Sequence, residues 1–248
     1  MNRIPPAYYG GWRDWWTLLH PPYTLMHLSF VVVGATLAPE LNLRTLLATL
    51  LAFFLAVGIA AHALDELAGR PLATNISAHI LVLLAILSLG LAVGIGIIGA
   101  IVSNIHILWF VIAGVFLAVS YNLELFGGFF HTDLWFGFAW GAFPALTANF
   151  AQTGAVDIVS LLGASYAFAI ALTQRHLSSP ARQLRRKVTS VEGIIRYRDD
   201  TTKQIDRPLL LKPLEDALQM LVLSSILIAF TLLGLRLWSG EWVSGFGI

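Results

Sequence analysis

The sequence contains no cysteine and few charged residues. Only 12% of its 248 residues are Asp, Glu, Lys or Arg, whereas soluble globular proteins carry about 25%. So few charges cannot cover a water-facing surface, which excludes a soluble domain, a disordered chain and a nucleic-acid-binding domain. The absence of cysteine excludes disulfide bonds and thiolate metal sites. The sequence is instead 57% hydrophobic, which indicates an integral membrane protein in contact with the lipid bilayer.

Long apolar runs predict the fold class. A bilayer core about 30 Å thick is crossed by about 20 apolar residues in a helix. Pro21 and Pro22 set the start of the first run, and Ser103-Asn104 forms the turn between the third and fourth. Because open sheets cannot span lipid, we expect an all-α polytopic bundle forming a single membrane domain over residues 1–248. Its seven predicted spans are 22–38, 43–62, 77–98, 103–121, 133–150, 155–175 and 215–237.

The N-terminal segment lacks the features of a cleavable signal peptide. Residues 8–19 instead predict an interfacial helix, because tryptophans prefer the headgroup level of a bilayer. Tryptophan occurs near both ends of the chain, at Trp12, Trp15, Trp16, Trp238 and Trp242.

Basic residues are distributed unevenly between the two predicted sides. With seven spans the termini lie on opposite sides, and the N-terminal side then holds 13 of the 15 Lys and Arg residues, leaving Arg44 and Arg236 opposite. The positive-inside rule predicts a cytoplasmic membrane protein with its N-terminus inside and its C-terminus outside.

One long polar segment, 176–214, follows the sixth span on the inner side. From Arg182 to Lys212 it carries nine basic and four acidic residues. Its part from Val191 to Ile205 has a strand–turn–strand pattern around Asp199-Asp200. Three interpretations stay open at this point: a small hairpin, an amphipathic flap on anionic lipid, or an ordinary solvated loop.

The end of the second span is rich in ionisable residues. His62, Asp65 and Glu66 share one helical face, since they are three and four residues apart. Such a face can hold a divalent metal or place an acid beside a base. Arg70 follows and could bind a phosphate. A solvated helix end with one basic partner is the structural alternative.

Two further inner segments carry candidate residues. Tyr121, Asn122, Glu124 and His131 surround a Gly-Gly turn, and Asp133 or Thr132 could cap the next helix. The end of the sixth span contributes Arg175 and His176, and lipid headgroup binding is the alternative for Arg175 and Arg182. We predict that His176 and two other histidines, His62 and His131, lie at matching depth. His20 and Tyr23 lie at the same mouth, and His27 is a weaker candidate.

At these residues the chain resembles the UbiA-type intramembrane prenyltransferase superfamily over roughly residues 18–237. His20-Pro-Pro-Tyr-Thr24 resembles the opening of the family's first helix, Gly69-Arg-Pro-Leu-Ala73 its first aspartate-rich region, and Tyr121 with Gly141 to Gly154 its Tyr-Ser loop and Gly-rich fifth helix. The resemblance implies a helix bundle around a cavity that is capped on the cytoplasmic side. In the family this cavity takes an isoprenyl diphosphate, which magnesium bridges to aspartates.

The chain departs from the family in its carboxylates. The first motif, Asn-Asp-x-x-Asp-x-x-x-Asp in the family, is here Ala61-His-Ala-Leu-Asp65-Glu-Leu-Ala-Gly69. The family's second aspartate-rich motif belongs at the end of the sixth span, where no carboxylate occurs from Ala171 to Lys187. Two magnesium ions need several hard oxygen ligands. Histidines mixed with carboxylates suit zinc, iron or manganese better. The candidate metal ligands are His62, Asp65, Glu66, His131 and His176.

These observations predict an enzyme that acts on an isoprenoid or lipid-like substrate with chemistry altered from magnesium-dependent prenyl transfer. The predicted catalytic residues are His62, Asp65, Glu66, Glu124 and His131, and the predicted substrate-binding residues are Arg70, Tyr121, Asn122, Arg175, His20 and Tyr23. The alternatives are a true prenyltransferase with an eroded motif, in which Asp65 and Glu66 hold one magnesium, and a non-catalytic lipid- or pigment-binding subunit with a protein partner. A transporter is disfavoured because no inverted repeat is visible.

Overall fold

A computed structural model describes residues 11–239 and 243–244 of the chain. Most of these residues are helical, which confirms the all-α prediction. The elements are α1 (Trp12–Leu19), α2 (Pro21–Thr36), β1 (Leu41–Asn42), α3 (Leu43–Phe53), η1 (Phe54–Ala61), α4 (His62–Gly69), α5 (Ala78–Val102), α6 (Ile107–Asn122), η2 (Phe126–Gly128), α7 (Asp133–Gly137), η3 (Phe138–Ala142), α8 (Phe143–Thr153), α9 (Ile158–Arg186), β2 (Ile194–Arg196), β3 (Thr202–Gln204), α10 (Arg207–Ser239) and β4 (Val243–Ser244).

The helices are those of a membrane protein. Four helical stretches are long and apolar enough to cross a bilayer, namely Leu43–Gly69, Ala78–Val102, Ile158–Arg186 and Arg207–Ser239. Large apolar side chains such as Leu83, Leu87 and Ile98 are exposed on the outside of the bundle, as lipid contact requires. The other three predicted spans are helical too, but they fall outside this set, and α6 has only 16 residues. The count of seven spans therefore stays a prediction.

Local sequence explains several helix ends. Helix α2 begins at Pro21, as predicted, and His20 before it has the left-handed backbone (φ 46°) that separates α1 from α2. A break between Val102 and Ile107 confirms the predicted turn at Ser103-Asn104. Helix α1 confirms the described part of the predicted N-terminal helix, and its three tryptophans are exposed. Residues 8–10 of that prediction, and Trp242, lie outside the described residues.

Glycine allows the closest helix contacts in the bundle. A Cβ atom on Gly34 of α2 would lie 2.0 Å from the backbone oxygen of Ala145 in α8, so only glycine fits there. On Gly141 of η3, a Cβ atom would lie 2.4 Å from the backbone oxygen of Ala167 in α9. Small residues at such crossings let membrane helices pack backbone to backbone. These contacts join α2 to α8 and η3 to α9, and the four segments form the frame that holds the site.

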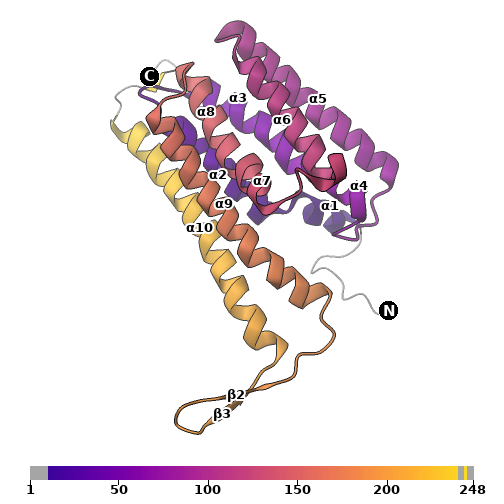
Figure 1. Ribbon diagram of the computed structural model, residues 1–248. Coiled ribbons are helices and arrows are strands. Elements are labelled where there is room, and N and C mark those ends of the chain that lie inside the picture. Colours follow the sequence, from indigo (N-terminus) through magenta and orange to yellow (C-terminus); the bar gives the residue numbers. More distant parts are fainter. Residues whose placement is uncertain (1–10, 240–242, 245–248) are drawn as a thin grey trace.

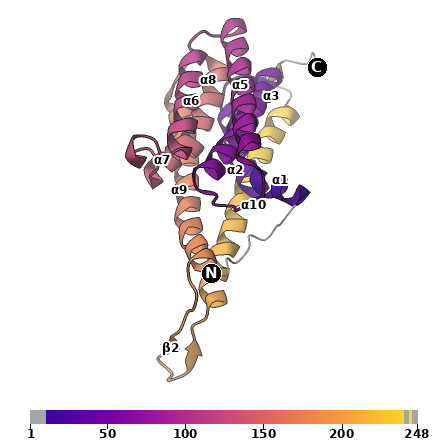
Figure 2. The ribbon, with the colours of Figure 1, turned by 90° about the vertical axis from the view of Figure 1, so that its right-hand side faces the viewer.

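Helices α9 and α10 run side by side and extend beyond the rest of the bundle (Figures 1 and 2). At their tip, β2 and β3 form an antiparallel hairpin in which Arg196 pairs with Thr202. This confirms the strand–turn–strand prediction for Val191–Ile205. The predicted loop boundaries 176–214 were wrong, because α9 continues to Arg186 and α10 starts at Arg207. The polar residues beyond 175 are mostly good helix formers, so the end of hydropathy is not the end of the helix.

Candidate functional site

A cavity of about 720 Å³ lies among α2, η1, α4, α6, η3, α9 and α10. Its apolar wall includes Val57, Ala61, Phe136, Trp140 and Val222. Ionisable and amide side chains line the rest of it. A mixed lining of this kind suits a ligand with an apolar body and a polar group.

Most of the residues that the sequence singled out meet in this cavity. They come from segments far apart in the chain, which the close packing of the helices brings together. The predicted site residues that line it are His20, Tyr23, His62, Asp65, Tyr121, Asn122, Glu124, His131 and Arg175. His27, the weaker candidate, lines it as well.

Glu66 has a different role from its neighbour Asp65. The Glu66 side chain is fully buried and accepts hydrogen bonds from the backbone N–H groups of Leu72 and Thr74, at 2.9 and 2.8 Å, and from the Thr74 hydroxyl at 2.9 Å. It does not line the cavity within the described part of the chain. Glu66 therefore fixes the loop after α4, which differs from the catalytic and metal-ligand roles predicted for it.

Arg70 belongs to the same loop. Its guanidinium donates to the carbonyl oxygen of Ile76 at 2.6 Å, and its Nη1 atom lies 3.9 Å from Glu66 Oε1. Arg70 is likewise absent from the described cavity lining, so it does not share the cavity with the other predicted substrate-binding residues. We call residues 70–77, with Glu66, the buried loop.

His176 points away from the other two histidines of the predicted trio. It is exposed and lies 3.9 Å from Asp133, whereas His62 and His131 line the cavity. Two members of the predicted trio, His62 and His131, therefore line one cavity, and His176 does not.

Three cavity histidines have the same hydrogen-bond pattern. In each case the Nδ1 atom faces a backbone carbonyl oxygen. For His27 this is the oxygen of Trp140 at 2.7 Å, for His62 the oxygen of Gly58 at 3.0 Å, and for His131 the oxygen of Tyr121 at 2.9 Å. A carbonyl only accepts, so each Nδ1 carries the hydrogen and each neutral ring has Nε2 as its acceptor. Gly58 and Trp140 lie in the π-helical segments η1 and η3, and such segments recur at functional sites.

His20 is held neutral at the mouth of the cavity. Burial, followed by the charges of His62, Arg186 and Arg182, lowers the pKa of His20 to about 4. Its ring centroid lies 6.0 Å from that of His62 and 5.3 Å from that of Tyr23. At neutral pH the imidazole of His20 is therefore uncharged.

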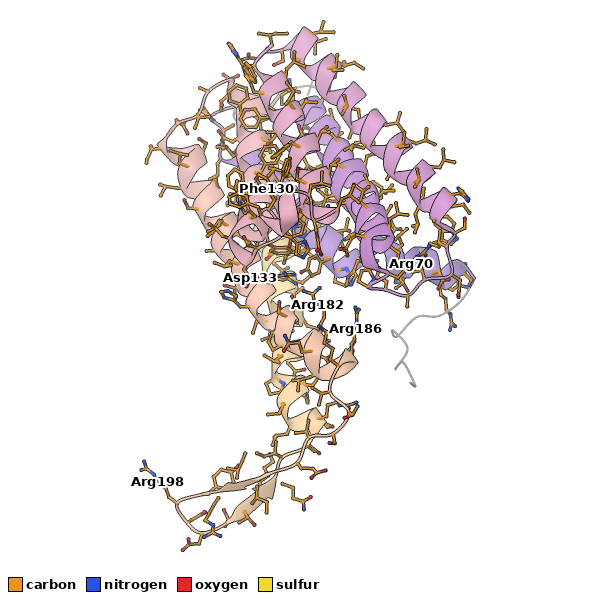
Figure 3. All side chains as sticks on the ribbon, turned by 45° about the vertical axis from the view of Figure 1, so that its right-hand side comes forward. Arg70, Phe130, Asp133, Arg182, Arg186 and Arg198 are labelled. Atoms are coloured by element: carbon orange, nitrogen blue, oxygen red, sulfur yellow. The ribbon has the colours of Figure 1, made fainter. Side chains whose placement is uncertain are left out.

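Arginines of α9 form one rim of the cavity, and Arg175 is the one that the sequence predicted as a site residue. Arg182, Arg185 and Arg186 line the cavity with Arg175, and Figure 3 shows Arg182 and Arg186 extending from the same side of α9. Arg175 pairs with Asp133 at 2.8 Å and Arg185 pairs with Glu215. Within the described residues Arg182 and Arg186 form no ion pair, and Arg186 donates a hydrogen bond to the carbonyl oxygen of Pro71. The guanidinium of Arg182 is therefore available to an anion. Their spacing from Arg175, seven and eleven residues, is the helical signal that identifies this face.

The cavity does not fit a resident metal ion. In residues 11–239, no three or more His, Asp or Glu side chains lie in a group that could hold one. Glu66 is committed to the buried loop and His176 lies outside the cavity, which leaves Asp65 as the carboxylate of the resembled motif. The magnesium, zinc, iron or manganese site suggested by the sequence has no preformed ligand set here.

Comparisons with known proteins add no relative. The chain matches no protein-family model, no curated protein and no solved structure. The resemblance to the UbiA-type superfamily therefore stays a prediction from the quoted motifs.

Proposed function

We propose that this protein is a UbiA-like membrane enzyme that acts on an isoprenoid or another lipid-like substrate in the cavity, with chemistry altered from magnesium-dependent prenyl transfer. The observation that carries the proposal is the two-part lining of that cavity. Val57, Phe136 and Val222 offer an apolar wall, and the arginines of α9 offer a cationic rim at the other part of the lining. An amphiphile satisfies both at once.

The proposal includes the topology predicted from the sequence. Seven spans would leave the basic end of α9 and the β2–β3 hairpin on the cytoplasmic side, with the N-terminus inside and the C-terminus outside. The supporting observation is that nine of the 15 Lys and Arg residues lie between Arg182 and Lys212, over the end of α9, the hairpin and the start of α10.

The proposed chemistry uses the histidines and Asp65. His62 would act as the general base through Nε2, since its Nδ1–H is bound to Gly58. His131 and Glu124 form a second acid–base pair, with Nε2 and Oε1 3.9 Å apart. Arg182 and Arg186 would hold an anionic headgroup by charge-assisted hydrogen bonds.

True prenyl transfer is the second candidate, and one observation favours it. Asp65, the aspartate that the resembled motif retains, lines the same cavity as Arg182 and Arg186. A prenyl diphosphate could bring one magnesium with it and bind between these groups. Prenyl transfer to an acceptor that requires magnesium and is lost in Asp65→Asn would favour this candidate over the altered chemistry.

A blocked cavity tests the main proposal. The Val222→Trp substitution would fill the apolar wall, whereas the matched Leu227→Trp substitution on the same helix changes a side chain that is 55% exposed on the outside. We expect farnesyl diphosphate and farnesol to raise the unfolding temperature of the purified protein and of Leu227→Trp, but not that of Val222→Trp. Equal stabilisation of both variants, or stabilisation of none of the proteins, would sink the proposal.

A further inference from the structure

Two side chains of opposite charge line the cavity without a partner. Asp65 lies on α4 and Arg182 on α9, and both belong to the cavity lining. Within residues 11–239 neither side chain takes part in an ion pair or a hydrogen bond. Asp65 is half-buried, so its carboxylate has lost part of its contact with water without gaining a partner.

The fold holds these two charges near each other but apart. The charge of Arg182 acts on the Asp65 carboxylate, so the two groups lie within electrostatic reach although they form no ion pair. Arg186, one turn further along the same side of α9 (Figure 3), donates a hydrogen bond to the carbonyl oxygen of Pro71. This contact ties the arginine face of α9 to the loop that follows α4, the helix that carries Asp65. A single ligand in the cavity therefore meets both charges.

Opposite charges in one site select against ligands of a single charge. An anion bound by Arg182 alone is repelled by Asp65, and a cation bound by Asp65 alone is repelled by Arg182. A ligand that carries both charges is attracted by both side chains.

The two side chains also define the kind of group that each can bind. The planar guanidinium of Arg182 matches the oxygens of a phosphate. A carboxylate only accepts hydrogen bonds, so Asp65 pairs better with an ammonium that has N–H groups than with a quaternary ammonium.

We propose that Asp65 and Arg182 form a zwitterion-recognition site that binds a phospholipid headgroup, with the phosphate at Arg182 and a primary ammonium at Asp65. The apolar wall, which includes Val57 and Val222, then holds part of one acyl chain. This assignment rests on the proposed function, because it names the headgroup chemistry of the lipid-like substrate. It gives Asp65 the ligand's own cation in place of a metal ion.

Two phospholipids that differ in the ammonium group test the site. Dioleoyl phosphatidylethanolamine and dioleoyl phosphatidylglycerol share the acyl chains and the phosphodiester, and only the first has an ammonium. Their binding to the detergent-purified protein is measured by native mass spectrometry with a chelator present, so that no metal ion contributes. We expect phosphatidylethanolamine to bind about five- to tenfold more tightly, since a hydrogen bond between charged groups contributes about that factor.

The Asp65→Asn variant removes the negative charge and keeps the shape of the side chain. We expect it to bind phosphatidylethanolamine about five- to tenfold more weakly, and phosphatidylglycerol as tightly as before or more tightly, because a repulsive charge is gone. Arg182→Gln should weaken binding of both lipids about fivefold, because both carry the phosphate. The matched control is Glu192→Gln, an exposed residue outside the described cavity lining, which should change neither affinity.

Four results would overturn the inference. An unaltered protein without preference for phosphatidylethanolamine, or a preference that survives in Asp65→Asn, would mean that Asp65 does not bind the ammonium. Phosphatidylethanolamine binding that persists in Val222→Trp would place the lipid outside the cavity. Farnesyl diphosphate binding that magnesium strengthens, with this gain abolished in Asp65→Asn, would assign Asp65 to a metal ion.

Failure of the site and failure of the proposed function give different results. Loss of selectivity between the two lipids, while farnesol still stabilises the unaltered protein but not Val222→Trp, leaves the proposed function standing. Failure of both lipids, farnesyl diphosphate and farnesol to bind removes the site and the proposed function together.

Discussion

The buried loop and the cavity contain the same kinds of side chain, but they use them in opposite ways. In the buried loop, Glu66 accepts hydrogen bonds from the backbone N–H groups of Leu72 and Thr74. Arg70 donates a hydrogen bond to the carbonyl oxygen of Ile76. In the cavity, Arg182 has no ion pair within the described residues and Tyr121 has an unpartnered hydroxyl. Satisfied polar groups stabilise a fold, whereas unsatisfied ones in a lined cavity are available to a ligand. Of two adjacent carboxylates, Asp65 lines the cavity and Glu66 belongs to the buried loop.

Breaking the buried loop should have the largest effect. The Glu66→Ala substitution leaves two backbone N–H groups and the Thr74 hydroxyl buried without an acceptor. We expect a loss of about 3 kcal/mol or more in the free energy of unfolding, measured by chemical denaturation in detergent. The neighbouring Asp65→Ala is the matched control and should cost less than half as much. Equal losses would contradict the division between the two carboxylates.

Substitutions of Arg70 and Arg182 should have effects of intermediate size, and they compare an arginine of the buried loop with an arginine of the cavity. We expect Arg70→Gln to cost about 1–2 kcal/mol of stability, because the loop carbonyls of Ile76 and Thr74 lose a charged donor. Arg182→Gln should leave stability within about 0.5 kcal/mol and weaken farnesyl diphosphate binding about five- to tenfold. The control Arg198→Gln, in the turn of the hairpin, should change neither quantity. Unaltered ligand affinity in Arg182→Gln would argue against the cationic rim.

The last expected effect is absent at neutral pH: it is the dependence of stability on acidic pH that His20 creates. The folded pKa of His20, about 4, lies below its ordinary value of 6.5, so in that interval the unfolded chain binds the extra proton. The contribution of the neutral ring is therefore present above pH 6.5 and is lost as the pH falls towards 4.

The variant for this test is His20→Asn, because asparagine tolerates the left-handed backbone (φ 46°) found at this position. Unfolding temperatures measured from pH 7.5 to 4 should fall less steeply in His20→Asn than in the unaltered protein. The exposed His106→Asn serves as control and should retain the full slope. An unchanged slope in His20→Asn would assign the pH dependence to other groups.

Much of the fold follows from the sequence, because hydropathy and turn residues act locally. Every predicted span is helical, and the break at Ser103-Asn104, the start at Pro21 and the hairpin after Val191 are where the patterns indicate. The end of α9 was missed because its last turns are polar yet helical, even with Pro180 inside. Polar helix formers look like loop residues when hydropathy alone is read.

Most of the predicted site residues line the cavity, but the structural role of Glu66 was not predictable. Helical spacing places Asp65 and Glu66 side by side, and it cannot tell which of them a later loop will fold over. That division depends on the path of residues 70–77, which bring Leu72 and Thr74 back onto Glu66. For the same reason Arg182 and Arg186 were not predicted as site residues, since their place in the cavity lining depends on α9 continuing past residue 175.

The length of α9 has a consequence for where the reaction would take place. Its 29 residues span about 44 Å at 1.5 Å per residue, which exceeds a hydrocarbon core of about 30 Å. In the topology proposed above, the last turns, which carry Arg182 and Arg186, would extend into the headgroup zone while the apolar wall would stay among the acyl chains. A substrate could keep its tail in the lipid and present its polar end to water, so bilayer thickness would set how deeply it is held.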